Sequence, residues 1–350
     1  MKNSQQSLNL DAFLASPDFY PINLDILNNK VLLVQLTRKE LRDASFHNKR
    51  SMTGNRKTFQ VDLSSFLSWT EEVSPEPKPV GYIFHNAFCG STLLSRYLDI
   101  AESTIVYREP SVLATLCDCK QNSPQWLESE PLQRMFRLMV ASLTRRKEKN
   151  ERSVIKLNDR CNNSIDDLLD LHPVNRGVLL FSDFQSFLLA ILDKPVRRKW
   201  LNERSNFCTD TPLNDYLPTV GASETSFTDA IARYWLTQML YFARVCNRQK
   251  GKVLPLPYRE LVKRPEETVT SVVDFLNIGV SSKTICENVT QIKQVHAKTG
   301  KRYYAKDDLE QKTLLSKKYA QEIEQATRCK DVLLESNSDL KERIVLFLKE

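Results

Sequence analysis

Short apolar runs alternate along the middle of the chain with longer segments in which apolar residues recur every three or four positions. The runs predicted as strands lie at 30–36, 81–84, 104–107, 153–157, 177–181 and 252–256. The helical spacing is clearest at 184–192, 226–249 and 265–276. Strands read as continuous apolar runs when helices cover both faces of a parallel sheet. The pattern therefore predicts an α/β fold with a mostly parallel sheet and helices on both faces.

Less regular segments flank this pattern. The N-terminal segment holds one of these strands and a short helix predicted at 37–43, and the three prolines within 74–80 predict a turn or linker after it. A charged helix is predicted at 131–151, and the chain beyond 281 is helical and mixed in charge. We therefore expect an N-terminal extension packed on the core (1–75), a P-loop-like α/β domain (76–280) and a helical C-terminal tail or lid (281–350).

Composition narrows the class of protein. The 350 residues are 41% hydrophobic and 27% charged, which suits one large α/β domain with additions. The net charge of +7 mildly favours anionic ligands, but no basic stripe interleaved with aromatic residues predicts nucleic-acid binding. No apolar leader or membrane-length apolar run is present, and the eight cysteines are irregularly spaced. We expect a cytoplasmic protein with reduced thiols, no metal site and no membrane span.

The most informative stretch is a glycine-bearing turn at 84–99, where a predicted strand ends and a predicted helix begins. Gly90 is one of only 8 glycines, and Ser91 and Thr92 follow it. A glycine lets the backbone wrap closely round an anion, and the first N–H groups of a helix point at it. The turn is not a Walker A loop, because Ser91 stands where that motif needs lysine and the motif's first glycine is absent. An ordinary strand-to-helix turn with a Ser/Thr cap remains the alternative.

Residues 87–94, AFCGSTLL, resemble the 5′-phosphosulfate loop of the sulfotransferases that use 3′-phosphoadenosine 5′-phosphosulfate. They are most similar to a sulfotransferase-like bacterial branch whose loop reads A-F-C-[GC]-S-T-L-L. Residues 257–278 are similar to the family's Y-E-D-L…P-E…F-L-G-L segment, and the preceding Tyr234-Trp235 helix also fits. The likeness spans about 80–276. It implies sulfuryl transfer from that donor to a hydroxyl or amine acceptor, which the sequence does not identify.

The loop departs from the family where Phe88 replaces its usual lysine or arginine, the cation that offsets charge on the leaving oxygen. Lys156 is the candidate replacement, since it ends a predicted strand and ligands gather at the carboxyl ends of parallel strands. Its segment, VIKLND, is similar to the K-D-P segment of tyrosylprotein sulfotransferases, whose lysine assists the leaving group. A lysine that merely extends to solvent from a strand end is the alternative.

Glu109 is the candidate base, because it follows the next predicted strand and a catalytic glutamate lies at a similar distance after the loop in tyrosylprotein sulfotransferases. Alternatively Glu109 pairs with Arg108 or caps a helix that begins after Pro110. His85 and His296 are the other candidate bases.

The family's 3′-phosphate site is also altered. Ser182 stands where the family has an arginine, and Ala190 stands where it has a serine. Arg197, Arg198 and Lys199, or Lys301 and Arg302, could supply the missing contacts, because arginine binds phosphate through two parallel hydrogen bonds. A solvated basic face is the alternative. The residues expected to hold the donor are Asn86, Phe88, Cys89, Gly90, Ser91, Thr92, Ser182, Arg198 and Arg302.

Two other functions stay open. The substitutions at Phe88, Ser182 and Ala190 are also those expected of a member of the fold that binds a nucleotide or a protein without turnover. A small-molecule kinase is disfavoured by the missing Walker lysine.

Overall fold

A computed structural model gives the structure of the chain. The residues that it describes are 8–54, 56–74, 78–122, 130–145, 151–207, 212–217, 226–293 and 305–349, with the side chains of 205–207 and 305–311 excepted.

Five parallel strands form the central sheet, in the order β5-β6-β4-β7-β8. Their bounds are β4 (Val80–His85), β5 (Thr104–Arg108), β6 (Arg152–Lys156), β7 (Arg176–Phe181) and β8 (Val253–Pro257). All five were predicted from their apolar runs. Because the strands are parallel, their carboxyl ends share one edge of the sheet, and β4 lies in its middle.

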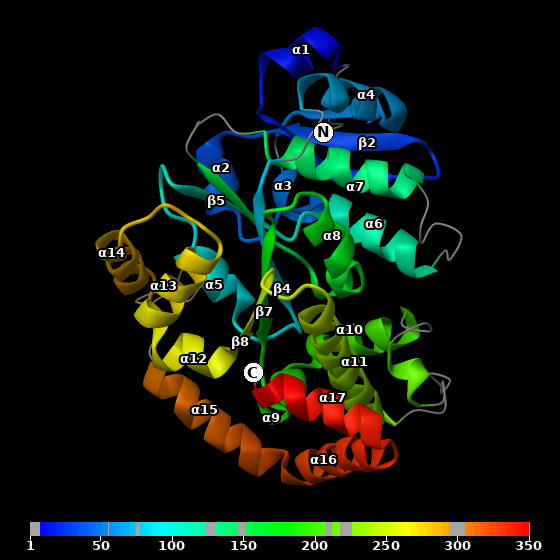
Figure 1. Cartoon of the computed structure of the whole chain (residues 1–350), viewed down its shortest axis with the longest axis vertical. Coiled ribbons are helices and arrows are strands. Elements are labelled where there is room, and N and C mark those ends of the chain that lie inside the picture. The colour runs from blue at the N-terminus through cyan, green and yellow to red at the C-terminus, as the bar shows by residue number, and fades with distance from the viewer. Residues whose placement is uncertain are drawn as a thin grey trace.

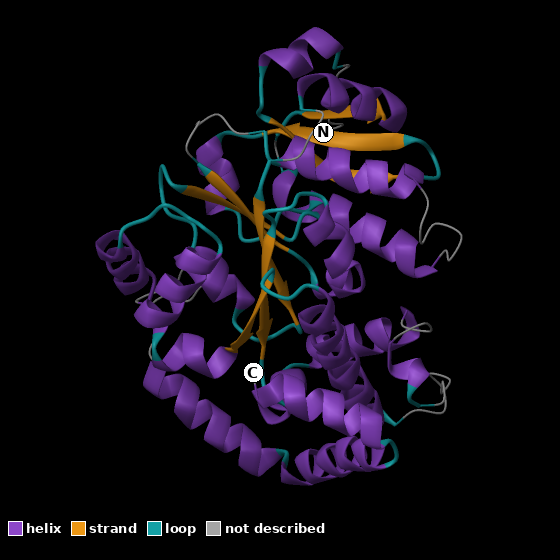
Figure 2. Ribbon diagram, in the orientation of Figure 1, coloured by secondary structure: helices purple, strands orange, loops and turns teal. Residues whose placement is uncertain are grey.

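Helices cover both faces of this sheet (Figures 1 and 2). On β4, Ile83 belongs to one hydrophobic cluster and its neighbours Tyr82 and Phe84 belong to the other, as alternating side chains must. The cluster around Ile83 includes α5 (Ser91–Tyr97), α13 (Pro265–Phe275) and α14 (Ser282–Lys293). The other cluster includes α6 (Ser111–Asn122), α8 (Ile165–Asp170) and α11 (Phe227–Arg248). The α/β fold with helices on both faces is thus confirmed.

The N-terminal segment forms a three-stranded antiparallel sheet in the order β1-β2-β3. Its elements are α1 (Leu10–Ala15), β1 (Phe19–Asp25), β2 (Lys30–Gln35), α2 (Arg38–Asp43), α3 (Lys49–Met52), β3 (Thr58–Asp62) and α4 (Leu63–Val73). The strand β2 and the helix α2 were predicted, whereas β1 and β3 were not. Apolar residues of this segment share one core cluster with the body of the protein. The boundaries of the three predicted regions stay a prediction.

The charged helix predicted to reach Glu151 is shorter than expected. It forms α7 (Glu130–Leu143), and Glu151 lies outside it, fully buried, where it pairs with Arg38 and Arg42 of α2. Burial of a carboxylate requires such cationic partners.

The C-terminal helices lie beyond the carboxyl ends of β7 and β8 (Figure 1). They are α15 (Ala305–Lys318), α16 (Ala320–Glu335) and α17 (Ser338–Lys349). Phe347 of α17 packs on Phe181, the last residue of β7, with ring centroids 5.0 Å apart. Three further helices complete the described elements of this end: α9 (Phe184–Leu192), α10 (Pro195–Phe207) and α12 (Tyr258–Lys263). Among the described residues, no helix has the length and apolar character needed to cross a membrane.

Candidate functional site

The loop between β4 and α5 has an unusual backbone. Ala87, Phe88 and Gly90 all have left-handed φ angles, of 65°, 50° and 79°. Such a conformation costs a residue with a side chain about 1–2 kcal/mol. Turns of this kind make backbone N–H groups converge into a concave anion-binding nest. Within the part of the chain that the structure describes, the N–H groups of Gly90, Thr92 and Leu93 donate to no protein acceptor.

Side chains hold the loop in this shape from beneath. The Nδ1 atom of His85 accepts the Ala87 N–H at 3.0 Å, and its Nε2 lies 2.9 Å from the Leu157 carbonyl oxygen. Asn86 clamps the end of β7, because its Oδ1 accepts the Ser182 N–H at 3.2 Å and its Nδ2 donates to the Ser182 carbonyl at 3.4 Å. The Cys89 thiol donates to the Leu180 carbonyl. The side chains of Asn86 and Cys89 therefore help to shape the loop, and their contact with the donor stays a prediction.

Electrostatics agree with these structural roles. Burial, followed by the nearby Lys156 ammonium, lowers the pKa of His85 to about 4, so the imidazole is neutral at pH 7. Both ring nitrogens of His85 have hydrogen-bond partners within the protein, so neither is available to take a proton from an acceptor substrate. Burial raises the pKa of Cys89 to about 12, so its side chain stays a thiol.

Gly90 is needed for a second reason besides its φ angle. A Cβ atom at this position would lie 2.4 and 2.7 Å from two ring carbons of Tyr258, the first residue of α12. The Lys312 ammonium lies 5.7 Å from the centre of the same ring. The helices α12 and α15 (Ala305–Lys318), both distant in sequence from the loop, thus meet at the Tyr258 ring beside Gly90.

Lys156 and Glu109, the two predicted catalytic residues, form an ion pair at the carboxyl edge. Lys156 ends β6 and is 2% exposed, whereas the Glu109 side chain, just after β5, is 19% exposed. Burial is the largest single influence on Glu109 and raises its pKa, but the Lys156 charge and the hydrogen bonds from Lys156 and Asn158 act together in the other direction, and the pKa of Glu109 falls to about 2. Glu109 also has a left-handed φ of 55°, a strain that often marks functional residues.

Asn158 fixes the second oxygen of Glu109, a contact that sequence reasoning missed. Its Nδ2 donates to Glu109 Oε2 at 3.1 Å, while its Oδ1 accepts Arg204 Nη2 at 3.3 Å and the Arg160 N–H at 3.2 Å. These donors to Oδ1 set the orientation of the amide. Arg204 in turn pairs with Asp159 at 3.1 Å. The asparagine two residues after Lys156 in the strand-end segment VIKLND was the available signal.

Phe88 stands where the phosphosulfate loop that the sequence resembles has a cation. Its half-buried ring contacts a different cation, that of Arg197. It packs edge to face on Trp200 of α10, with centroids 4.9 Å apart, and the Arg197 Cζ atom lies 5.0 Å from its centre. Arg197 Nη1 also donates to the Ala190 carbonyl at 2.6 Å. Arg197 therefore lies beside Phe88 and Ala190, two of the three positions at which the sequence differs from the motifs that it resembles.

Arg198, the arginine named from the sequence, lies elsewhere. Its Cζ atom is 5.4 and 5.6 Å from the ring centres of Phe227 and Tyr319. No contact of Arg198 with the loop is found among the described residues. Lys301, Arg302 and His296 lie outside the described residues.

Ser182 is placed at the carboxyl end of β7, beside the loop. It is 2% exposed, and its hydroxyl has no hydrogen-bond partner within the described part of the chain. The Ser182 carbonyl accepts Trp235 Nε1 at 3.1 Å, which fixes the backbone. A buried hydroxyl without a partner costs about 1–3 kcal/mol, so a ligand that accepted from it would gain by that amount.

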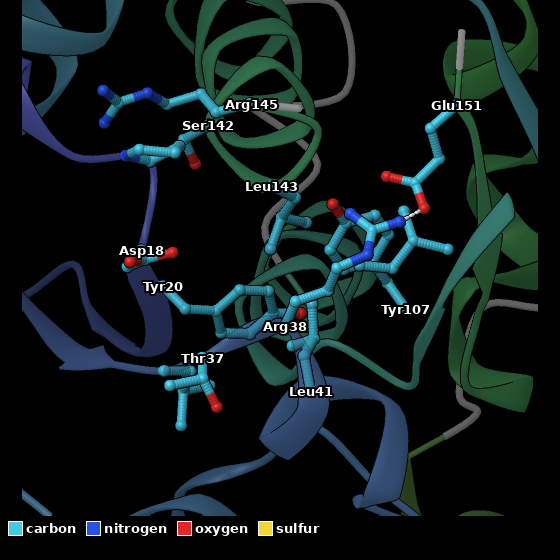
Figure 3. A pocket seen from close by; sticks show the side chains of 13 residues that line it. Asp18, Tyr20, Thr37, Arg38, Leu41, Tyr107, Ser142, Leu143, Arg145 and Glu151 are labelled. Carbon is cyan, nitrogen blue, oxygen red and sulfur yellow. Dashed lines mark ion pairs between the residues drawn. The ribbon is translucent and has the colours of Figure 1, made fainter. Parts of the chain in front are cut away.

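A cavity of about 40 Å³ lies where the N-terminal segment meets β5 and α7 (Figure 3). Figure 3 shows Arg38 directed toward Glu151 in this cavity, which is lined by no residue of the loop. The described residues contain no cluster of side chains suited to a metal ion.

Comparison with known proteins gives structural neighbours only. No family model matches the chain, and no curated protein matches its sequence. The chain is similar to three solved sulfotransferases: STF9 from Mycobacterium avium (TM-score 0.43, 9% identity, 73% of this chain and 79% of that one), one from Alicyclobacillus acidocaldarius (0.38, 14%, 73% and 96%) and the domain from the curacin biosynthetic pathway (0.41, 13%, 64% and 80%). These neighbours belong to the family that the sequence resembles. With TM-scores below 0.5, they carry no argument about activity, which has to be inferred from the chain's own residues.

Proposed function

We propose that the protein is a sulfotransferase that moves a sulfuryl group from 3′-phosphoadenosine 5′-phosphosulfate to a hydroxyl or amine acceptor. The observation that supports this most is the Lys156–Glu109 pair at the carboxyl edge, beside a loop in which the N–H groups of Gly90, Thr92 and Leu93 donate to no acceptor among the described residues. The resemblance of residues 87–94 to the phosphosulfate loop gives the chemical class.

The residues present fit such a donor. The open N–H groups of Gly90, Thr92 and Leu93 suit the 5′-phosphosulfate, with the Ser91 and Thr92 hydroxyls next to them. The unpartnered Ser182 hydroxyl and the Arg197 guanidinium flank the loop on the side of β7 and suit the donor's other phosphate. We propose Arg197 for this contact in preference to Arg198, because Arg197 is the one that packs on Phe88.

In the proposed reaction the acceptor oxygen or nitrogen attacks sulfur. The bond between sulfur and the bridging oxygen breaks, and adenosine 3′,5′-bisphosphate leaves. Lys156 offsets the charge that develops on that oxygen, and Glu109 takes the proton of the acceptor. An electrostatic contact of this kind contributes on the order of 10²-fold or more in rate.

The resting ion pair restrains Glu109. A carboxylate with a pKa near 2 is a weak base at neutral pH, because a base works best when its pKa lies near the working pH. When the Lys156 ammonium turns toward the donor, its effect on Glu109 weakens and the pKa of Glu109 rises. Donor binding thus prepares the base.

Transfer of labelled sulfate from the donor to a panel of alcohols, phenols and amines tests the proposal. We expect the Lys156→Met substitution to lower kcat at least 10²-fold while binding of adenosine 3′,5′-bisphosphate, measured by calorimetry, falls much less. Lys252→Met is the matched control, because Lys252 also pairs with a carboxylate, that of Asp170, but its side chain is much more exposed than that of Lys156. Equal transfer by wild type and Lys156→Met would refute the mechanism.

A non-catalytic nucleotide-binding protein is the second candidate, favoured by Phe88 in place of the loop cation. The same experiment separates the two. Tight binding of the bisphosphate without transfer to any acceptor of the panel would establish the second candidate.

A further inference from the structure

A cavity of about 320 Å³ opens at the amino edge of the central sheet, at the opposite ends of the strands from the proposed catalytic edge. It is lined by the first residues of β4, β6 and β7 and by the segment that follows α13. Its size falls at the lower end of the range of about 300–1,000 Å³ that small-molecule sites occupy. We call it the amino-edge cavity.

The amino-edge cavity is cationic. Arg152 and Arg176 line it, and no aspartate or glutamate does. In the parallel register Gly81 lies opposite both Val154 and Arg176, so Arg152, two residues before Val154, leaves the sheet on the same face as Arg176. Two guanidinium groups thus flank β4 where Gly81 contributes no side chain.

Neither arginine forms an ion pair with a described residue. The half-buried Arg152 side chain has no ion pair or hydrogen bond to another described residue. Arg176 donates through Nη1 to the Phe275 carbonyl at 2.7 Å, and its Cζ atom lies 5.4 Å from the Phe275 ring centre. That contact fixes the Arg176 side chain but supplies no negative charge.

The amino-edge cavity also has an apolar wall, which Leu276 and Ile278 supply beside the two arginines. Ser153 is 1% exposed, and its side chain leaves the sheet on the face opposite that of Arg152, since neighbouring residues of a strand alternate. Its buried hydroxyl, which has no hydrogen-bond partner among the described residues, is therefore no part of the anion site.

We propose that the amino-edge cavity binds a small organic anion, with its carboxylate or phosphate group between Arg152 and Arg176 and its apolar body against Leu276 and Ile278. Guanidinium groups bind both kinds of anion through paired hydrogen bonds. This site is separate from the Gly90 loop, so it stands whether or not the protein transfers sulfate.

Calorimetric titration of the full chain with phenyl phosphate and with benzoate tests the proposal, and benzyl alcohol serves as the neutral analogue. We expect saturable binding of at least one anion, and binding of the alcohol at least 10-fold weaker. Arg152→Met should weaken anion binding at least 10-fold, and Arg152→Lys should weaken it less. Circular dichroism establishes that each variant is folded.

Two controls identify the site. Arg248→Met removes an exposed arginine that pairs with Asp166, and it should leave anion affinity unchanged. Saturating adenosine 3′,5′-bisphosphate should not displace the anion. No saturable binding by the wild type, equal binding of the alcohol, an unchanged Arg152→Met variant, or displacement by the bisphosphate would each overturn the proposal.

Discussion

Glu109 is held by two partners with different chemistry. Lys156 supplies a positive charge to Oε1, whereas Asn158 supplies a neutral N–H to Oε2. The first contact is the stronger control on the ionisation of the carboxylate, and the second, which also lowers its pKa, fixes where it points. This division allows the charge of the proposed base and its position to be tested separately.

We predict that Asn158 is a positioning residue. Asn158→Ala should lower kcat about 10-fold with little change in the KM for the donor, because the main loss is the orientation of Glu109. Asn158→Asp places a second carboxylate beside Glu109 and should raise the pKa of Glu109, which moves the acid limb of the kcat profile to higher pH. Rate measurements from pH 5 to 9 provide the test. An Asn158→Asp profile that coincides with that of the wild type would contradict the assignment.

At the scale of helices and strands, the sequence pattern predicted some elements and missed others. Four of the five central strands could be predicted because they are buried on both faces and read as apolar runs. The edge strand β8 is only partly buried but is also an apolar run. The helix α9 was predicted with its observed bounds, since Asp183 caps it and apolar residues fill it. The strand β1 was missed because Pro21 interrupts its apolar pattern, and β3 is short with polar residues at alternate positions.

The candidate site divides in the same way. Gly90, Ser91 and Thr92 are adjacent in sequence, so their pattern was visible. Lys156 and Glu109 could be placed because strand ends of a parallel sheet meet at one edge. The neighbourhood of Phe88 could not be predicted. The position of α10 depends on tertiary packing that no local pattern encodes. This packing brings Arg197 to Phe88 and Arg204 to Asn158.

The backbone of the loop between β4 and α5 depends on glycine at position 90. Gly90→Ala places a Cβ against the Tyr258 ring and strains the φ of 79°. We expect the free energy of unfolding to fall by about 1–3 kcal/mol and binding of adenosine 3′,5′-bisphosphate to fall at least 10-fold. Urea denaturation and calorimetry measure the two effects. The double variant Gly90→Ala/Tyr258→Ala removes the clash but keeps the strained φ, so it should recover only part of the stability. Full recovery would show that the φ angle is immaterial.

At the scale of the whole molecule, the N-terminal segment meets the central sheet through buried charges and a buried histidine, His47. Arg108 of β5 is fully buried and pairs with Asp99, and its guanidinium donates to the Arg42 and Ala44 carbonyls at the end of α2. His47 joins the same contact. Its backbone N–H donates to the Arg108 carbonyl at 2.7 Å, and its ring Nδ1 accepts the backbone N–H of Arg108 at 3.2 Å. An Nδ1 that accepts must be unprotonated.

Acid should therefore weaken this junction. Burial, followed by the Arg108 charge, lowers the pKa of His47 to about 3, against about 6.5 in an unfolded chain. The unfolded state then binds more protons, so stability is full above pH 6.5 and falls as the pH drops toward 3. Between pH 7 and 5 the loss attributable to His47 is about 2 kcal/mol. His85, with a pKa of about 4, adds a loss of similar size over the same interval.

Urea denaturation of the wild type and of His47→Gln, measured between pH 5 and 7, isolates the contribution of His47. Glutamine cannot be protonated, so the variant should lose about one proton from the pH dependence of its unfolding free energy and should be less sensitive to acid than the wild type by about 2 kcal/mol. The variant is less stable at pH 7 if glutamine fails to reproduce the contacts of His47 with Leu41 and Arg108, but this offset does not change the slope. If the two slopes coincide, His47 is not the neutral buried group that links the N-terminal segment to the sheet. If the variant loses the whole pH dependence, His85 makes no contribution, and its assignment as a buried neutral support of the Gly90 loop is wrong.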